Sequence, residues 1–252
     1  MKGVILAAGR GSRLGSLTDH RPKCLVPLAG QPLLAWQRDA LIAGGADQTA
    51  IVVGYQADLL RRLGMPTFYA PRWDQTNMVV SLCAAAPWLR TEPCVVSYGD
   101  IVFEPAAVRA LVAARGDLAI TYDPRWHDLW SRRFDDPLED AETFVLADNG
   151  SVARIGGRAA DVEEIEGQYM GLLRFTPASW AAVETTLDRL SARQRDRLDM
   201  TGLLQLLIYA GHRVEAVPYR GGWGEVDHES DLEVCESLVA QRLLRRPGRR
   251  AS

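Results

Sequence analysis

Short apolar runs alternate with amphipathic segments through the first half of the chain, in units of about 25 residues. Apolar or β-branched runs predict strands, and apolar residues at helical spacing predict helices between them. Parallel strands joined by helices need right-handed crossovers, so the pattern predicts a mostly parallel, Rossmann-like α/β sheet flanked by helices. Such sheets bind ligands at the carboxyl ends of their strands. The predicted strands are 2–7, 50–53, 67–70, 94–97 and 118–122, and the predicted helices are 33–43, 57–63, 77–89 and 105–115.

The second half opens with a different segment, 122–171, which is polar and interrupted by Pro124, Pro137 and the turn Asp148-Asn149-Gly150. It predicts a small β insertion over the sheet edge, with strands at 142–146 and 152–155. Beyond it we expect strands at 169–175 and 213–217 and helices at 178–190 and 203–209. The pattern Ser230-x-x-Glu233 predicts a capping box for a last helix that ends near residue 244. We therefore expect one domain over 1–243 and a flexible basic tail over 244–252.

Charge and cysteine content exclude several functions. The formal net charge of −3 implies no sequence-independent attraction to nucleic acid or to an anionic membrane. The four cysteines are scattered without a C-x-x-C pair, which argues against a zinc site and a disulfide framework. No run reaches the length of a membrane span, and the short apolar N-terminus is followed at once by arginines. We expect a cytoplasmic protein, and the sequence leaves its oligomeric state open, with a homodimer as one option.

A glycine-rich loop follows the first predicted strand. Small residues let the backbone approach a polyphosphate, and arginine and serine side chains add donors to phosphate oxygens. The loop matches neither the Walker A pattern nor G-x-G-x-x-G, because the position five after Gly9 is Leu14. A plain strand-to-helix turn is the alternative. The residues of this candidate phosphate loop are Leu6, Ala7, Ala8, Gly9, Arg10, Gly11, Ser12 and Arg13.

Lys23 lies between Pro22 and the apolar residues that lead to Pro27. Proline restricts both itself and the preceding residue, so this lysine is predicted to sit in a rigid, extended segment that can aim it at the same polyphosphate. An ordinary solvated lysine is the alternative reading.

Two aspartates follow strand-like segments far apart in the sequence. Asp100 ends the apolar run 94–99, where α/β sheets bind ligands, and a carboxylate there suits Mg²⁺. Glu225 and Asp227 alternate in a second extended segment and so point to one face. Because the predicted capping box does not need Asp227, we expect Asp227 to be a metal ligand, with Glu225 as a further candidate.

The segment LAAGRGSRLGSLTDHRPKCLVPLAGQPLL resembles the signature of the sugar-phosphate nucleotidyltransferase family. The resemblance continues through Thr76-Asn77-Met78, Tyr98-Gly99-Asp100 and Glu225-Val226-Asp227. Details such as Thr-Asn-Met-x-x-Ser-Leu are similar to the cytidylyltransferase branch that acts on phosphonates or phosphocholine. The resemblance implies transfer of CMP from CTP to a small phosphonate, of the phosphonoformate or 2-aminoethylphosphonate type, or to a phosphocholine-like acceptor. It further implies one or two Mg²⁺ ions on Asp100 and Asp227, with Lys23 and Arg13 as catalytic residues.

The same resemblance suggests where the two substrates bind. The nucleotide base is expected against Leu6 to Ala8, Tyr98 and Gly99, with Asn77 and Ser81 as side-chain partners, although Asn77 could serve only as a helix cap. Arg132 and Arg133 suit an extra acceptor carboxylate or the phosphonate itself, whereas aromatic residues and Asp140 suit an ammonium group, so the acceptor stays open. The insertion could also be solvated surface. The acceptor candidates are Tyr122, Arg132, Arg133, Asp140, Glu142, Tyr169 and Gly171.

Other classes of function fit less well. A dinucleotide-dependent oxidoreductase would need the missing third glycine, and a metal-dependent glycosyltransferase would normally show Asp-x-Asp where this chain has Gly99-Asp100-Ile101. A sugar-1-phosphate nucleotidyltransferase that uses UTP, dTTP or GTP is the nearest alternative. A non-catalytic nucleotide-binding subunit is a third, but the joint presence of Lys23, Asp100 and Asp227 argues against it.

Overall fold

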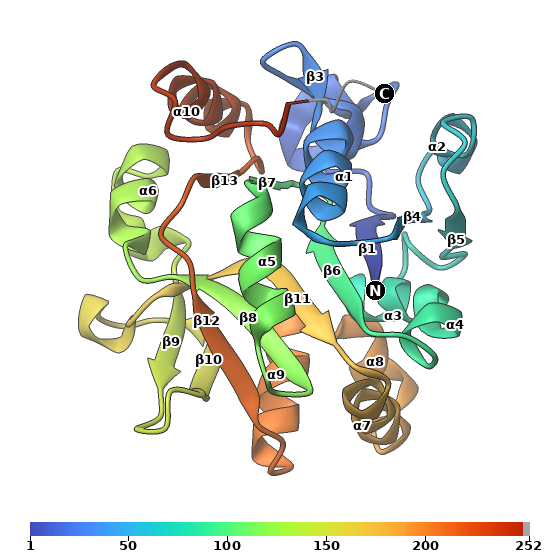
Figure 1. Ribbon diagram of the computed structural model, residues 1–252, viewed down its shortest axis with the longest axis vertical. Helices are drawn as coiled ribbons and strands as arrows, with labels where there is room; N and C mark the ends of the chain where they lie inside the picture. Colours follow the sequence, from blue (N-terminus) through green and yellow to red (C-terminus); the bar gives the residue numbers. More distant parts are fainter. Residues whose placement is uncertain (249–252) are drawn as a thin grey trace.

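A seven-stranded sheet organises the computed structural model, which describes residues 1–248 (Figure 1). Its strands lie in the order β12-β8-β11-β6-β1-β4-β5. Neighbouring strands are parallel except around β11, which runs antiparallel to β6 and β8. The predicted α/β class with a mostly parallel sheet is confirmed. The strands are β1 (Lys2–Ala7), β4 (Gln48–Val53), β5 (Thr67–Tyr69), β6 (Cys94–Tyr98), β8 (Leu118–Asp123), β11 (Gln168–Phe175) and β12 (Val214–Pro218).

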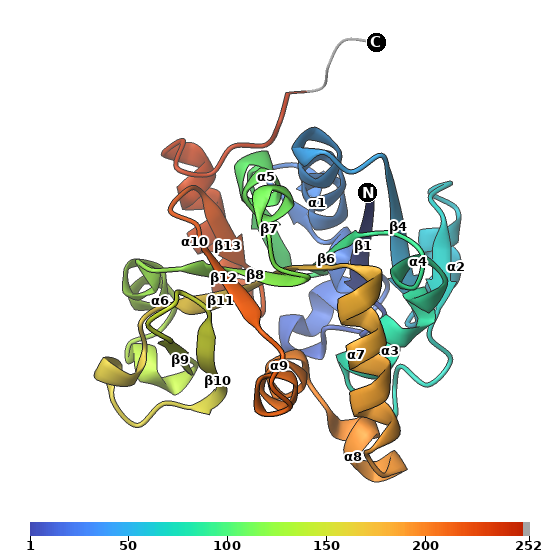
Figure 2. The ribbon, with the colours of Figure 1, turned by 60° about the horizontal axis from the view of Figure 1, so that its bottom comes forward.

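Helices cover both faces of this sheet, because its central strands bury side chains on both faces. In β1, Val4 and Ile5 are both fully buried but belong to different hydrophobic cores. Figure 2 shows α1 and α5 on one side of the sheet and α3, α7 and α9 on the other. The helices are α1 (Leu33–Gly44), α2 (Ala57–Arg61), α3 (Met78–Leu82), α4 (Ala86–Leu89), α5 (Pro105–Ala113), α6 (Trp126–Arg133), α7 (Pro177–Asp188), α8 (Ala192–Arg197), α9 (Met200–Tyr209) and α10 (Glu229–Ala240).

Short elements connect this framework. The predicted insertion contains the hairpin of β9 (Glu142–Leu146) and β10 (Val152–Arg158), closed by the predicted turn, in which Asn149 accepts hydrogen bonds from Ser151. It also contains α6, which the sequence analysis missed. The remaining short elements are β2 (Pro27–Leu28), β3 (Gln31–Pro32), β7 (Ile101–Phe103), β13 (Trp223–Glu225), and the 3₁₀ helices η1 (Ser12–Thr18), η2 (Lys23–Leu25), η3 (Cys83–Ala85), η4 (Pro137–Glu139) and η5 (Val162–Glu164).

The ladder between β7 and β13 was not predicted, and it determines the geometry of the site. Residue Glu225 pairs with Ile101 in this antiparallel ladder, and the Val226 amide donates to the Asp100 carbonyl at 2.9 Å. Three-residue strands carry too little periodicity to be recognised from sequence. The ladder brings the segment that contains Asp227 beside the end of β6, although the two lie far apart in the sequence.

Two predicted helix boundaries were wrong. The helix expected over 77–89 is divided into α3, η3 and α4, and Pro87 lies at the start of α4, where proline is tolerated. The predicted capping box of Ser230 and Glu233 is also absent from α10. There His228 is the N-cap, and the Asp231 carboxylate accepts hydrogen bonds from the backbone amides of Asp227 and His228.

The start of the predicted flexible tail packs against the rest of the molecule. Leu244 is buried, the Arg245 amide donates to Glu104 at 3.0 Å, and Arg246 pairs with Asp39 at 2.6 Å. Residues 244–248 therefore differ from the expectation, while 249–252 lie outside the described residues. No helix within 1–248 combines the length and the apolar character that a membrane crossing requires.

Candidate active site

The glycine loop after β1 passes directly over Lys23. Gly11 adopts a left-handed conformation with φ of 74°, and a Cβ there would lie 2.6 Å from the Lys23 Cβ. Only glycine allows this contact without displacing the lysine. Pro22 is extended as predicted, whereas Lys23 itself begins the single turn η2. The loop and the proline-restricted segment thus fix the lysine together.

Lys23 connects the two predicted metal carboxylates. Its Nζ lies 2.9 Å from an oxygen of Asp100 and donates a second hydrogen bond to Asp227. Arg13 pairs with the other oxygen of Asp227 at 3.0 Å. The Lys23 side chain is only 12% exposed, so it does not extend into bulk water. The predicted convergence of loop, lysine and distant carboxylates is therefore present in the structure.

These pairings set the charges of the site. Burial lowers the pKa of Lys23, but the adjacent Asp100 and Asp227 raise it by more, so that its pKa lies above the ordinary value. Burial raises the pKa of Asp227, but Lys23 and Arg13 more than offset this and hold it below the ordinary value. Lys23 is consequently a fixed positive charge at neutral pH and is unsuited to act as a general base.

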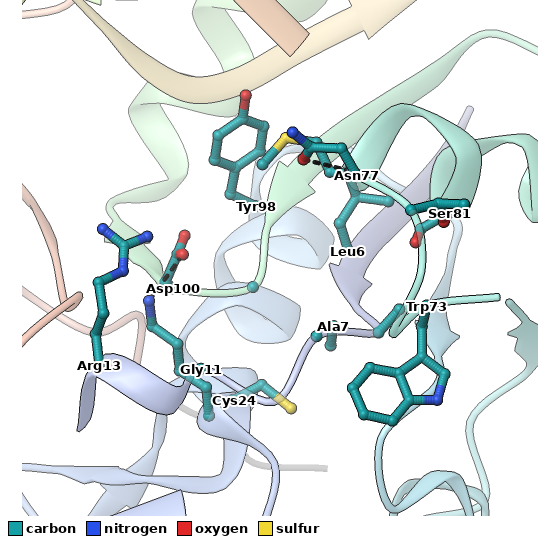
Figure 3. Close-up of a pocket in the computed structure, with 16 residues that line it drawn as sticks. Leu6, Ala7, Gly11, Arg13, Cys24, Trp73, Asn77, Ser81, Tyr98 and Asp100 are labelled. Atoms are coloured by element: carbon teal, nitrogen blue, oxygen red, sulfur yellow. Dashed lines mark hydrogen bonds and ion pairs between the residues drawn. The ribbon is translucent and has the colours of Figure 1, made fainter. Parts of the chain in front are cut away.

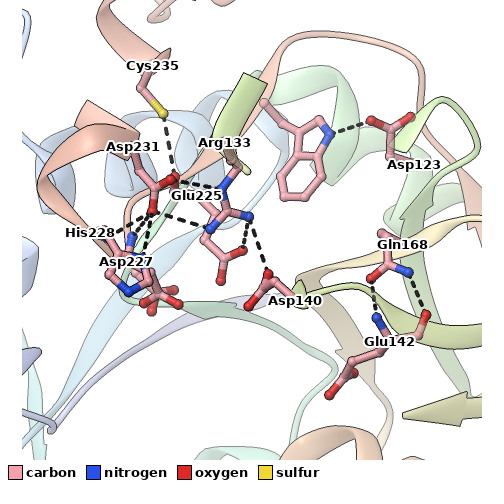
Figure 4. Close-up of polar contacts among 12 residues, drawn as sticks. Asp123, Arg133, Asp140, Glu142, Gln168, Glu225, Asp227, His228, Asp231 and Cys235 are labelled. Carbon is pink, nitrogen blue, oxygen red and sulfur yellow. Dashed lines mark hydrogen bonds and ion pairs between the residues drawn. The ribbon is translucent and has the colours of Figure 1, made fainter. Parts of the chain in front are cut away.

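Arg133, predicted as an acceptor residue, instead contacts carboxylates next to Asp227 (Figure 4). Its side chain is 1% exposed, with Nε at 3.0 Å from Asp231 and Nη1 at 2.9 Å from Glu225. Asp231 in turn holds the backbone amide of Asp227 at 2.8 Å. This placement contradicts a direct acceptor contact. This buried guanidinium is engaged by its carboxylate partners, and it links the segment of Glu225 to Asp231 in α10.

Three carboxylates are close enough to share one cation. Oxygens of Asp100, Glu225 and Asp227 lie within 4.8 Å of one another. The second oxygen of Asp100, Oδ1, is buried without a hydrogen-bond partner in the described part of the chain. Buried carboxylate oxygens are rarely left unpaired, so this atom fits a ligand that bonds to oxygen. The hard oxygen donors match what Mg²⁺ prefers.

A cavity of about 240 Å³ extends from this charged cluster along the ends of β1 and β6 (Figure 3). Arg13 and Asp100 lie at one end, while Trp73, Asn77 and Ser81 lie at the other. Gly99 forms part of the wall, and a Cβ there would lie 2.3 Å from the Leu6 carbonyl oxygen. The predicted residues that line the cavity are Leu6, Ala7, Ala8, Gly9, Gly11, Arg13, Lys23, Asn77, Ser81, Tyr98, Gly99 and Asp100.

At the uncharged end of the cavity, Asn77 has a different role from the predicted contact with the nucleotide base. Asn77 is the N-cap of α3: its Oδ1 accepts from the Met78 amide at 2.7 Å, and its Nδ2 donates to the Arg197 carbonyl at 3.3 Å. Its amide is therefore already engaged, as the capping alternative anticipated. The sequence analysis missed Trp73, which precedes the Thr76-Asn77 motif and could have been noticed there. Cys24, Thr76 and Met78 also line the cavity, and burial raises the pKa of Cys24 to about 12, so this thiol stays protonated.

Two residues of the predicted phosphate loop lie outside this cavity. Arg10 pairs with Asp19 at 2.8 Å and stacks over Tyr55, and Ser12 begins η1. Two predicted acceptor residues are also elsewhere: Tyr122 is buried against Phe144, and Arg132 lines a separate cleft. Sequence adjacency suggested these positions, but none of the four is among the residues that line the cavity.

The remaining acceptor candidates are not among the residues that line the cavity, although Tyr169 and Gly171 contact its Tyr98. Tyr169 packs edge-on against Tyr98, and Gly171, with φ of 74°, leaves room for the Tyr98 ring, because a Cβ there would approach it to 2.8 Å. Glu142 contacts Thr201 at 3.4 Å, and Asp140 lies 3.9 Å from Arg133. Burial and the nearby charge of Asp199 raise the pKa of Glu142 to about 7. Tyr169 thus adds an aromatic ring next to Tyr98, while Asp140 and Glu142 add carboxylates elsewhere in the insertion.

Together, the sheet topology and the lysine–carboxylate cluster define a nucleotidyltransferase. The chain belongs to the MobA-like NTP transferase domain family, whose model matches residues 3–169. It is 35% identical over 250 residues to the CTP:phosphoglutamine cytidylyltransferase of Campylobacter jejuni, an alignment that covers 93% of this chain and 98% of that one. It is also 38% identical over 122 residues to the CMP-5'-(3-aminopropyl)phosphonate synthase of Streptomyces rubellomurinus, covering 45% of this chain and 19% of the relative.

Solved structures show the same fold. The inositol-1-phosphate CTP transferase of T. maritima superposes with a TM-score of 0.76 at 21% identity, over 94% of each chain. The CTP:phosphocholine cytidylyltransferase of Streptococcus pneumoniae superposes with a TM-score of 0.71 at 20% identity, over 94% of this chain and 98% of that one.

Proposed function

We propose that the protein transfers CMP from CTP to a small acceptor that carries a phosphate or phosphonate group together with an amino or amide group. The observation that carries the proposal is the contact of Lys23 with both Asp100 and Asp227 at the end of the cavity beside the glycine loop. The cytidylyltransferases among its relatives support CTP as the donor.

In this proposal an anionic oxygen of the acceptor attacks the α-phosphorus of CTP, and the bond to the β-phosphate oxygen breaks to release diphosphate. Because that oxygen is already charged at neutral pH, no protein base is required, and catalysis consists of positioning and charge stabilisation. Lys23 neutralises charge at the α-phosphate, while Arg13 and the loop amides hold the leaving diphosphate. The raised pKa of Lys23 supports this role, since the amine stays protonated.

Asp100 and Asp227, with Glu225 beside them, are the residues that would hold Mg²⁺. When bound, the ion supplies positive charge to phosphate oxygens that are being brought together. Arg133 and Asp231 keep these carboxylates in place through the contacts that they make with Glu225 and the Asp227 backbone.

The acceptor's nitrogen-bearing group is assigned to the part of the insertion next to Tyr98. Glu142, Asp140 and Tyr169 offer carboxylates and an aromatic ring, which suit an ammonium or amide group. The names of the relatives, which include phosphoglutamine and an aminopropylphosphonate, support the same class of acceptor.

The test is diphosphate release from each of CTP, UTP, GTP and dTTP with Mg²⁺ and a panel of acceptors. The panel comprises phosphoglutamine, 2-aminoethylphosphonate, phosphonoformate, phosphocholine and glucose 1-phosphate. We expect release with CTP and a nitrogen-bearing acceptor, and a CMP adduct by mass spectrometry. Release only with glucose 1-phosphate and UTP or dTTP would assign the enzyme to the sugar branch, and no release in any pairing would favour a nucleotide-binding subunit.

A further inference from the structure

A second cleft, of about 590 Å³, lies apart from the active-site cavity, and the two share no lining residue. Its walls come from α6, the segment before β13, and the end of α10, which Figure 1 shows grouped at one side of the molecule. Five arginines line it, and each is exposed at the surface. We call it the arginine cleft; its arginines are Arg125, Arg132, Arg220, Arg242 and Arg245.

None of these five guanidinium groups forms an ion pair with a carboxylate in the part of the chain that the structure describes. Their only hydrogen bonds to other residues there reach backbone carbonyls: Arg125 donates to Arg220, and Arg245 donates to Arg242 at 3.1 Å. Among exposed arginines elsewhere, some have acidic partners, such as Arg10, Arg61 and Arg90, and others within residues 1–248 have none. The cleft therefore concentrates positive charge that the protein itself leaves uncompensated, in a chain of net charge −3.

Three carboxylates line the same cleft, and two of them are already satisfied by other donors. Asp123 accepts from the Arg125 amide at 2.7 Å and from the Trp223 indole at 2.8 Å. Glu104 accepts from the Arg245 amide at 3.0 Å. Only Asp128 is exposed and without such a partner among the described residues, so the lining keeps a surplus of positive charge.

We propose that the arginine cleft binds a small polyphosphate anion at a site separate from the active site. Each guanidinium offers five N–H donors in a planar fork that matches phosphate oxygens. Five such groups around one cleft supply more donors than the oxygens of a dicarboxylate can accept, which favours a chain of phosphates. The volume lies in the range of small-molecule sites, so the ligand is a small molecule rather than a macromolecule.

The test uses tripolyphosphate as the probe, in calorimetric titrations of the full chain without Mg²⁺ at low salt. The double charge reversal R220E/R242E should weaken binding at the cleft by at least about tenfold, because each lost contact is a charge-assisted hydrogen bond. The matched control R189E/R193E changes two exposed arginines outside the cleft that have no ion pair in residues 1–248, and it should shift affinity by about twofold or less. The milder R220Q/R242Q pair guards against misfolding and should also weaken binding.

A third variant separates the two sites. K23M removes the lysine of the active site. Tripolyphosphate should still bind K23M at the arginine cleft, whereas R220E/R242E should weaken that binding. The proposal is overturned if wild type does not bind the probe, if K23M abolishes all binding, or if R189E/R193E weakens binding as much as R220E/R242E. Citrate, a tricarboxylate, should bind more weakly than tripolyphosphate, and the reverse order would contradict the assignment to phosphate. Because no CTP or acceptor is involved, the result is independent of the proposed transfer reaction.

Discussion

Two regions of the molecule contain several cationic side chains, and these side chains differ in whether they have acidic partners. Around the active site, Lys23, Arg13 and Arg133 all contact carboxylates, and two of the three are buried. In the arginine cleft, five exposed guanidinium groups have no carboxylate partner within residues 1–248. Paired buried charges are held in one geometry, whereas unpaired exposed charges remain solvated until an anion arrives. The difference distinguishes side chains that fix the site from side chains available to a ligand.

The largest expected effect is at Arg133. R133M would leave the buried Asp231 and the partly buried Glu225 without their guanidinium partner, and we expect it to lower the free energy of unfolding by about 4 kcal/mol. The neighbouring R132M is the matched control, because Arg132 is exposed and unpaired in the described structure, and it should change stability by less than about 0.5 kcal/mol. Urea denaturation measures both. Equal effects of the two variants would show that the buried network does not stabilise the fold.

Arg133 should also affect cation binding. In a variant that remains folded, such as R133K, we expect weaker binding of Mn²⁺, measured directly by paramagnetic resonance, since Glu225 and the Asp227 backbone lose their brace. Unchanged Mn²⁺ affinity would restrict Arg133 to a structural role.

The second-largest expected effect is on the catalytic rate, in a variant of Lys23. K23M should lower kcat by about a hundredfold, equivalent to about 3 kcal/mol of transition-state stabilisation. The chain contains one other lysine, Lys2, which lies at the surface near Glu92, and K2M should leave kcat within about twofold. The assay is diphosphate release with the nucleotide and acceptor identified by the panel. A K23M enzyme with nearly normal kcat would remove Lys23 from the proposed mechanism.

Glu142 is a half-buried carboxylate with no cationic partner among residues 1–248, and it therefore sharpens the comparison. The pKa of Glu142 is raised from an ordinary 4.5 to about 7, mainly by burial and then by the charge of Asp199. The folded state therefore binds this proton more tightly than the unfolded state, so Glu142 contributes stability below pH 4.5 that is lost as the pH rises through 7.

E142Q removes this titration. We expect the variant to be more stable than wild type by about 2 kcal/mol at pH 8 and equal to it near pH 4. The exposed Glu139 serves as control, and E139Q should show no such pH dependence. Thermal denaturation across this pH range provides the measurement. A stability difference between E142Q and wild type that does not vary with pH would contradict a near-neutral pKa.

The smallest effect is expected in the arginine cleft. Since its guanidinium groups have no ion pairs within residues 1–248, R220Q/R242Q should change the free energy of unfolding by no more than about 0.5 kcal/mol. The weaker repulsion between the remaining arginines acts to increase that free energy. Urea denaturation without added anions is the measurement. A loss as large as that of R133M would mean that these arginines have structural partners.

Much of the site was predictable because its parts lie in short, patterned segments. The apolar run of β1, the glycines after it and Lys23 beside proline are all local features, and each one restricts the backbone by itself. Asp100 at the end of a buried strand follows from the same reasoning. The resemblance to a known family then connected these segments with Asp227.

The acceptor region was less predictable. Arg132 and Arg133 are neighbours in sequence and were assigned one role, yet on α6 they point in different directions, one into the arginine cleft and one into the buried network. Asn77 could be recognised as a polar residue at a helix start, but whether its amide capped the helix or faced a ligand depended on Met78 and Arg197.

The sequence by itself determined the α/β class, the glycine loop after the first strand and the candidate lysine and two aspartates, because strand periodicity, glycine and proline act on the local backbone. Only the tertiary structure decided which charges became partners. The short β7–β13 ladder brings Asp100 beside Asp227, and Arg133 finds Asp231 across 98 residues of sequence. The physical reason is that an ion pair depends on distance in space and on exclusion from water, and neither follows from the spacing of residues along the chain.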